Sequence, residues 1–356
     1  MDLLAESGGE MAGRAEATAE ELAASPEWFP LEMAGQRAIR LVRLDEAAYE
    51  AASFLDRRVL RSQPAERRCS VESAAIAGAR LAPDAHYIFH IGHVGSTLVS
   101  RLVGGHEALF SVREPALLRA AAAAPEAAIA GLSLRDQLAL LARTWRPGQR
   151  AVIKPTSYVG EQAGTILGLH ERSAAIFMFT PPLNYLRAIL AGPNSRSESR
   201  VLAPLRLLRL RERTGAGAVA RDPESEGEWI AMNWLCEMTA LRQAADRFAS
   251  RVLWVDFDEF LAAPASGLNA VFRTLGVPLE SREIERLLRG EVMSRYSKAP
   301  EYAYDADLRR QVLASADHEH GHEIRRGVDW LTRLAGRHPL IDASLSRRAP
   351  EGGGQN

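Results

Sequence analysis

The stretch that decides the fold is HYIFHIGHVGSTLVSRLV, which covers residues 86–103. Its first part, HYIFHI, is short and almost continuously apolar, which is typical of a strand buried on both faces of a parallel sheet. Its last part, from Thr97 to Val103, has the apolar spacing of an amphipathic helix. Gly92 and Gly95 lie between the two and allow a tight turn. The stretch therefore predicts a strand, a glycine-rich turn and a helix in direct succession.

Runs of the same kind recur along the chain and alternate with segments of helical character. This alternation predicts βαβ units, and hence an α/β, P-loop-type three-layer fold with a central parallel sheet. Roughly the last hundred residues are helical in character, which predicts a helical C-terminal part. The further predicted strands are ALFSV (108–112), AVIK (151–154), AAIFMFT (174–180) and RVLWVDF (251–257), and the predicted helices are Thr97–Val103, Leu117–Trp145, Tyr158–Leu169, Leu183–Ala191 and Glu228–Phe248.

The chain divides by composition into four parts. Residues 1–27 are rich in Ala, Glu and Gly and lack a sustained apolar face, so we expect a disordered N-terminus. Residues 28–83 indicate a small αβ unit, with a short strand and a helix capped by Asp45. Residues 84–348 form the expected main domain with its helical extension, and residues 349–356 form a disordered tail.

The overall composition excludes several classes of protein. The 356 residues carry 44 basic and 45 acidic side chains, so the net charge of −1 gives no global attraction for nucleic acid or an anionic membrane. The N-terminus lacks the features of a signal peptide, and no segment is apolar enough to span a bilayer. Cys69 and Cys236 are far apart and form no CxxC motif. We expect a cytoplasmic protein without nucleic-acid partners or membrane insertion.

The turn after the first strand has the features of an anion-binding loop. Gly92 and Gly95 let the main chain approach a phosphate closely. Ser96 and Thr97 add hydroxyl groups at the N-terminus of the next helix, where the helix dipole favours negative charge. No Lys precedes Ser96, so the GxxxxGK[ST] pattern is not met and ATP with magnesium is disfavoured. A plain packing corner is the alternative, and the loop by itself leaves both interpretations open.

The loop is similar to the phosphosulfate-binding loop of the sulfotransferase family, especially its Golgi and bacterial branch. That family has the pattern Pro-Arg/Lys-Ser-Gly-Thr-Thr-Leu, onto which GHVGSTL (92–98) falls, with Gly92 at the Pro position and His93 at the Arg/Lys position. The resemblance covers about residues 85–285. It continues through SRLVGGHEALFSVREP (100–115), VIKPT (152–156) and RVLWVDFDEFLAAPASGLNAVFRTLGVPL (251–279).

The resemblance implies transfer of a sulfuryl group from 3′-phosphoadenosine 5′-phosphosulfate to a hydroxyl or amine of a small-molecule or peptide acceptor, without a metal. Glu114 takes the place of a glutamate that some members use as catalytic base. His93 and Lys154 are the other residues expected to take part in catalysis. The phosphosulfate would be held by Gly92, His93, Val94, Gly95, Ser96 and Thr97.

Two departures from the family pattern concern charge. The family's 3′-phosphate site has an Arg after the fourth strand and a Ser eight residues later, where this chain has Thr180 and Ala188. We expect Arg187, Arg295, Ser297 and Lys298 to replace them. The loop cation is also missing, because His93 is only partly protonated near neutral pH. Lys154 or Arg101 could supply that charge instead.

Other segments carry weaker signals. The six arginines between Arg196 and Arg213 could form a lid over the site or a solvated helix face. We expect Asp256, Asp258 and Glu259 to cap a helix and Trp229 and Trp234 to pack in the core, and His318, His320 and His322 suggest a metal site only weakly. Two other functions stay open: a kinase-like phosphotransferase on a divergent P-loop, and a non-catalytic nucleotide-binding domain.

Overall fold

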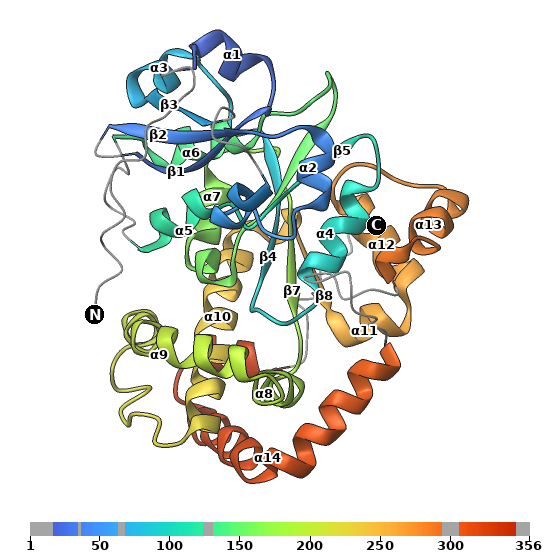
Figure 1. Cartoon of the computed structure of the whole chain (residues 1–356). Coiled ribbons are helices and arrows are strands. Elements are labelled where there is room, and N and C mark those ends of the chain that lie inside the picture. Colours follow the sequence, from blue (N-terminus) through green and yellow to red (C-terminus); the bar gives the residue numbers. More distant parts are fainter. Residues whose placement is uncertain (1–16, 35–36, 63–67, 124–130, 294–305, 347–356) are drawn as a thin grey trace.

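The central feature of the computed structural model is a five-stranded parallel sheet (Figure 1). Its strand order is β5-β6-β4-β7-β8, so the strand that precedes the glycine-rich turn lies in the middle. The sheet confirms the predicted α/β class and all five predicted strands. The structure describes residues 17–34, 37–62, 68–123, 131–293 and 306–346. The strands are β4 (Ala85–His90), β5 (Leu109–Arg113), β6 (Arg150–Lys154), β7 (Ala175–Phe179) and β8 (Val252–Asp256).

The apolar runs form these strands because helices cover both faces of the sheet. Every residue of β4 and β5 is buried. Figure 1 shows α4 (Ser96–Gly104) and α12 (Pro264–Thr274) on one side of the sheet, and α7 (Ala163–Gly168) and α10 (Glu226–Phe248) on the other. The result is the predicted three-layer arrangement, in which continuous apolar runs are favoured over alternating ones.

A new helix starts at Ser133 within the alanine-rich segment between β5 and β6, so the prediction of one continuous helix over Leu117–Trp145 is wrong for the described residues. α5 spans Ala116–Ala123 and α6 spans Leu134–Leu141. Ser133 begins α6 through a reciprocal capping box with the aspartate three residues later, and Gly131 just before it has a φ of 75°. The capping box starts a new helix at this point, although the alanine content favours a continuous one.

A three-stranded antiparallel sheet precedes the central sheet and lies at the top of Figure 1. Asp45 caps its helix α2, as predicted. The expectation of disorder is wrong for residues 17–27, because Thr18 caps helix α1 and Leu22 is fully buried. Residues 1–16 and the tail lie outside the described residues, and the division of the chain into domains stays a prediction. The elements are α1 (Ala19–Ala24), β1 (Trp28–Met33), β2 (Ala38–Arg43), α2 (Glu46–Ala51), η1 (Arg57–Ser62), β3 (Arg68–Glu72) and α3 (Ser73–Gly78).

Two arginines of the main domain hold the C-terminal end of α2. Arg101 on α4 donates to the carbonyl oxygen of Glu50 at 3.1 Å, and Arg113 on β5 donates to that of Ala52 at 2.8 Å. The last carbonyl groups of a helix lack partners within the helix, so cations are stabilised there. The expectation that Arg101 supplies charge to the glycine-rich loop is therefore wrong, because α2 and Ser53 take up its guanidinium.

The chain that leaves α2 runs along the outer edge of the central sheet. Leu55 donates its amide to the carbonyl oxygen of Arg113 at 2.8 Å and accepts the amide of Ala116 at 3.1 Å. β5 is an edge strand, and these bonds cover part of its free edge. They also carry the residues on either side of Leu55 to the carboxyl end of β5.

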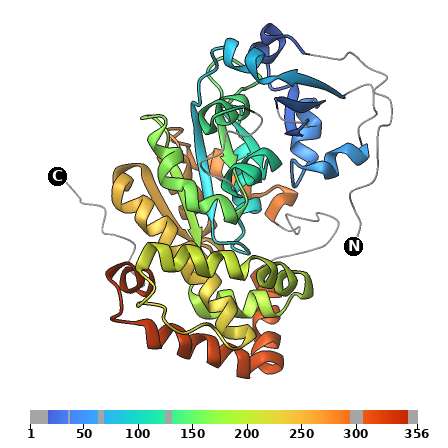
Figure 2. The same ribbon diagram turned by 90° about the vertical axis from the view of Figure 1, so that its left-hand side faces the viewer.

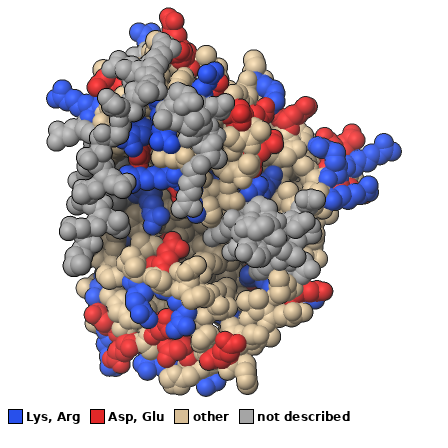
Figure 3. Space-filling model, in the orientation of Figure 1, with Lys and Arg blue, Asp and Glu red and all other residues tan. Residues whose placement is uncertain are grey.

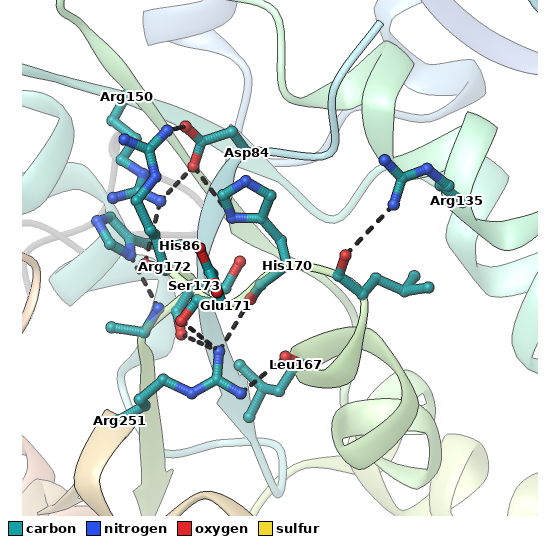
Figure 4. Close-up of polar contacts among 12 residues, drawn as sticks. Asp84, His86, Arg135, Arg150, Leu167, His170, Glu171, Arg172, Ser173 and Arg251 are labelled. Atoms are coloured by element: carbon teal, nitrogen blue, oxygen red, sulfur yellow. Dashed lines mark hydrogen bonds and ion pairs between the residues drawn. The ribbon is translucent and has the colours of Figure 1, made fainter.

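Structural ion pairs close the opposite, amino-terminal edge of the sheet (Figure 4). Asp84, just before β4, pairs with Arg150 and, at 2.6 Å, with Arg172. His86 of β4 accepts the amide of Ala174 at Nδ1 over 3.0 Å. These contacts fix the starts of neighbouring strands relative to one another.

A layer of helices covers the carboxyl edge of the sheet (Figures 1 and 2). α8 (Pro182–Leu190), α9 (Pro193–Thr214) and α14 (Ala306–Leu334) all pack on α10 there. In the described part of the chain, no helix has the length and apolarity needed to cross a membrane. The remaining helices are η3 (Ser157–Gln162), η4 (Ala249–Arg251), α11 (Phe257–Ala262), α13 (Ser281–Leu288), η5 (Glu291–Met293) and α15 (Pro339–Leu345).

Candidate active site

The loop between β4 and α4 has the backbone of an anion-binding turn. Gly92, His93 and Gly95 have φ angles of 88°, 56° and 63°, in the left-handed region. Successive turns of this kind direct main-chain amides towards a common point, here at the N-terminus of α4. The Gly92 amide itself donates to Nδ1 of His90 at 3.0 Å. A left-handed conformation is strained for a non-glycine residue such as His93, and such strain is concentrated at functional loops.

Gly95 has no room for a side chain, because the ring of Phe257 covers it. An ideal Cβ atom at Gly95 would lie 2.0 Å from Cε2 of Phe257. Phe257 begins α11, directly after β8, so the end of a distant strand supports the loop. Val94, the loop residue before Gly95, is fully buried and anchors the loop in the core.

Ser96 and Thr97 begin α4, and both are buried. Oγ1 of Thr97 has no hydrogen-bond partner among the described residues. A buried hydroxyl without a partner is costly, and such groups in native structures are often satisfied by a ligand or an ion. Thr97 is therefore suited to donate to an anion held at the N-terminus of α4.

Glu114 and Lys154 meet at the carboxyl edge of the sheet, on the β5–β6 side of the loop. Nζ of Lys154 lies 2.5 Å from Oε1 of Glu114, and the lysine side chain is fully buried. The amide of Glu114 donates to the carbonyl oxygen of Lys154 at 2.6 Å, and Glu114 has a φ of 48°. The parallel register that places Arg113 beside Lys154 brings the pair together. The buried ammonium group holds the carboxylate in place at the sheet edge, where it is suited to accept a proton from a bound acceptor.

A cavity of about 300 Å³ is lined by Glu114 and by the start of the loop. It brings together Gly92, His93 and Glu114, three of the residues expected at the site, with residues that the sequence did not indicate. Figure 3 shows this face hollowed between the N-terminal part and the helical layer, with basic side chains on the upper side of the hollow. The residues missed by sequence reasoning include Phe54, Arg58, Arg119 and Ser157, whereas Arg206 belongs to the run of arginines that the sequence offered as a possible lid.

Arg206 extends from α9 to the wall of this cavity. It is buried, and its Nε donates to Oε1 of Glu237 at 2.8 Å, while Nη2 donates to Oγ of Ser157 at 3.3 Å. In the described part of the chain, these bonds leave its Nη1 group without an acceptor. Burial lowers the pKa of Arg206, but the attraction of Glu237 outweighs burial, so the guanidinium remains charged.

The other arginines between Arg196 and Arg213 bind acidic side chains or carbonyl groups instead of closing over the site. Arg196 pairs with Glu226 at 2.5 Å, and Arg211 pairs with Asp222 at 2.5 Å. Arg209 donates to the carbonyl oxygen of Ala122 at 2.6 Å. Most arginines of this run therefore make structural contacts. Arg206 is the arginine of the run that lines the cavity.

On the other side of the loop, at the ends of β7 and β8, Asp258 is surrounded by donors. Oδ2 accepts from Oγ1 of Thr180 at 2.5 Å and from Nδ2 of Asn184 at 2.9 Å. Oδ1 accepts from Nε of Arg309 at 2.9 Å. Asp256, two residues earlier, is the residue that caps α11, so the expected capping role is confirmed for Asp256 and not for Asp258.

The residues expected to read a 3′-phosphate are not together in the described structure. Arg187 is bound by Asp317, with Nη2 and Oδ2 2.6 Å apart, and it also donates to Oδ1 of Asn184 at 3.0 Å. Thr180 is fully buried, with its hydroxyl on Asp258. Arg295, Ser297 and Lys298 lie outside the described residues.

The remaining candidates are placed away from the loop. Trp234 is buried in the core and donates from Nε1 to the carbonyl oxygen of Thr180 at 3.0 Å, whereas Trp229 is partly buried. His318, His320 and His322 lie on α14, whose backbone is kinked at His320. Among the described residues, no three His, Cys, Asp or Glu side chains gather to hold a metal ion.

Comparisons with known proteins found similarity at the level of three-dimensional structure. No protein-family model matches the chain, and no curated protein matches it in sequence. A sulfotransferase domain from the curacin biosynthetic pathway is similar at 17% identity and a TM-score of 0.39, over 70% of this chain and 98% of that domain. Mouse sulfotransferase SULT7A1, complexed with PAP, is similar at 10% identity and a TM-score of 0.41, over 75% of this chain and 89% of the mouse chain. A sulfotransferase from Alicyclobacillus acidocaldarius is similar at 16% identity and a TM-score of 0.36, over 69% of this chain and 98% of that one.

Proposed function

We propose that this protein transfers a sulfuryl group from a nucleotide 5′-phosphosulfate, such as 3′-phosphoadenosine 5′-phosphosulfate, to a hydroxyl or amine acceptor. The observation that carries the proposal is the meeting of two features at one sheet edge. One is a left-handed glycine-rich loop with a threonine hydroxyl that has no partner among the described residues, and the other is a carboxylate held by a buried ammonium group. The first suits the phosphosulfate and the second suits an acceptor that loses a proton.

The donor would bind with its phosphosulfate at the N-terminus of α4. Loop amides and the hydroxyls of Ser96 and Thr97 would stabilise the negative charge that gathers on the phosphate oxygen as its bond to sulfur breaks. The Nη1 group of Arg206 offers two further donors on the opposite wall, where the sulfuryl oxygens would lie. In the family pattern a loop Arg or Lys supplies positive charge at the position that His93 occupies here. Arg206 would supply that charge instead.

The acceptor would approach from the cavity above Glu114. Its oxygen or nitrogen forms the new bond to sulfur while the bond between sulfur and the phosphate oxygen breaks, in line with it. Glu114 takes the proton that the acceptor loses, and Lys154 holds the carboxylate in the orientation that this step needs. The product nucleotide leaves with the electron pair of the broken bond.

The test of this mechanism is the variant Glu114→Gln, which keeps the shape of the side chain and removes its basicity. We expect its turnover of the phosphosulfate donor, measured over a panel of phenols and amines, to fall on the order of a hundredfold. Nucleotide binding, measured by calorimetry, should stay within about threefold of the unmodified protein, because the loop is untouched. Glu107→Gln, exposed in the turn before β5, is the matched control and should keep full activity.

Three outcomes would remove parts of the proposal. Full activity in Glu114→Gln would remove Glu114 from the role of base. Magnesium-dependent ATP turnover in place of donor turnover would favour the kinase-like alternative. Tight nucleotide binding without turnover over the whole acceptor panel would favour a non-catalytic nucleotide-binding domain.

A further inference from the structure

The end of β7 holds a ready-made anion site, and the chain fills that site with its own carboxylate. The hydroxyl of Thr180, the amide of Asn184 and the guanidinium of Arg309 all donate to Asp258. Burial would raise the pKa of Asp258, but the hydrogen bonds from these three side chains outweigh burial and lower it. Asp258 is therefore a fixed negative charge that engages the Thr180 hydroxyl, the Asn184 amide and Nε of Arg309. Nη2 of Arg309 is buried and has no hydrogen-bond partner among the described residues.

Asp258 lies beside the elements that support the loop. β7 is the direct neighbour of β4 in the sheet, and the amide of Ile91 donates to the carbonyl oxygen of Met178 at 3.3 Å. Phe257, the residue before Asp258, is the one that covers Gly95. The carboxylate itself is 29% exposed and lines a second cavity of about 440 Å³, together with Asn184 and Arg309.

A carboxylate at this place discriminates between a hydroxyl and a phosphate on a ribose. It can accept a hydrogen bond from a sugar hydroxyl, whereas it repels a phosphate, and dinucleotide-binding sites use an acidic residue or an arginine to make the same distinction. Arg309 binds Asp258 through Nε, and Arg187, which lines the same cavity, is bound by Asp317. The network thus favours a neutral group beside Asp258.

We infer that the donor nucleotide of this protein carries a free ribose 3′-hydroxyl, which donates a hydrogen bond to the carboxylate of Asp258. A 3′-phosphate would therefore give no gain in affinity. This inference rests on the proposed function, because it concerns the same nucleotide. It names the donor class as an adenosine 5′-phosphosulfate without the 3′-phosphate. It also assigns Asp258 as the residue that determines this specificity.

The experiment compares AMP with adenosine 3′,5′-bisphosphate, which differ only in the 3′-phosphate. Isothermal calorimetry on the full chain should give dissociation constants equal within about threefold, or favour AMP. Asp258→Ser empties the anion site and frees its donors, so this variant should gain a preference for the bisphosphate of about tenfold or more. Asp258→Asn keeps the volume and removes the charge, and it should show a smaller gain in the same direction if Asp258→Ser does not fold.

Asp307→Ala is the matched control, because it removes a negative charge from α14 at an exposed ion pair with Arg310 and leaves the network intact. It should not change the ratio of the two dissociation constants. A tenfold preference for the bisphosphate in the unmodified protein would overturn the inference and leave the proposed function standing. An unchanged ratio in both Asp258 variants would also overturn it. Binding of neither nucleotide to any of these proteins would overturn the proposed function, and the inference with it.

Discussion

Gly95 shows how much of the loop depends on a single missing side chain. Its backbone has a φ of 63°, and the ring of Phe257 occupies the space that a Cβ atom would need. A substitution there meets both backbone strain and a steric clash. The glycine therefore serves two purposes, since it turns the loop and lets the end of β8 pack against it.

We expect Gly95→Ala to destabilise the protein by about 2–4 kcal/mol, the sum of a left-handed backbone cost and an overpacking cost. Nucleotide binding should be lost as well, because the clash displaces the loop. Gly148→Ala is the control, since Gly148 has a φ of 80° but open space around it. It should cost only the backbone part, about 1 kcal/mol. Urea denaturation of both variants measures the difference, and equal losses would contradict the clash with Phe257.

At the scale of the elements, β4 has different chemistry at its two ends. Its carboxyl end leads into the loop, and its amino end carries His86 beside the ion pairs of Asp84 (Figure 4). Burial, reinforced by the nearby charge of Arg150, lowers the pKa of His86 from 6.5 to about 4. The folded protein therefore holds His86 neutral in the middle of the sheet.

This burial makes the sheet sensitive to acid. Between pH 6.5 and 4 the unfolded chain binds a proton at His86 that the folded chain does not, so stability is complete above pH 6.5 and falls as the pH drops towards 4. The shift corresponds to a loss of at most about 3 kcal/mol. His86→Asn, whose Oδ1 can still accept the Ala174 amide, should flatten the dependence of unfolding free energy on pH. His318→Asn, at an exposed position, should leave it unchanged, and equal slopes in all three proteins would remove His86 as the cause.

At the scale of the whole molecule, the N-terminal unit is part of the site. Phe54 and Arg58, which follow α2, line the same cavity as Glu114. Tyr49 of α2 joins the two parts, because its ring makes edge contacts with Phe29 on one side and with Phe110 on the other. We therefore expect the N-terminal unit and the main domain to unfold together.

Calorimetry of the unmodified protein should show one transition whose calorimetric and van't Hoff enthalpies agree. Tyr49→Ala should lower the unfolding free energy by about 3–5 kcal/mol, because it empties a buried aromatic site between the two parts. Tyr49→Phe loses only the hydrogen bond of the hydroxyl to the carbonyl oxygen of Pro26 and should cost about 1 kcal/mol. Two separate transitions in the unmodified protein would show that the parts fold independently.

The sequence by itself determined the α/β class, the five central strands and the loop, because each depends on local periodicity and on residues adjacent in the chain. It also brought Glu114 and Lys154 to one edge of the sheet, since each directly follows or ends a buried parallel strand. Only the tertiary structure decided which charges meet. Arg101 binds the C-terminal end of α2, and Arg206 reaches the cavity from a distant helix. Asp258 accepts hydrogen bonds from the side chains at and just after the end of β7. These contacts join residues up to 78 positions apart, and their energies depend on burial and direction, which no local pattern encodes.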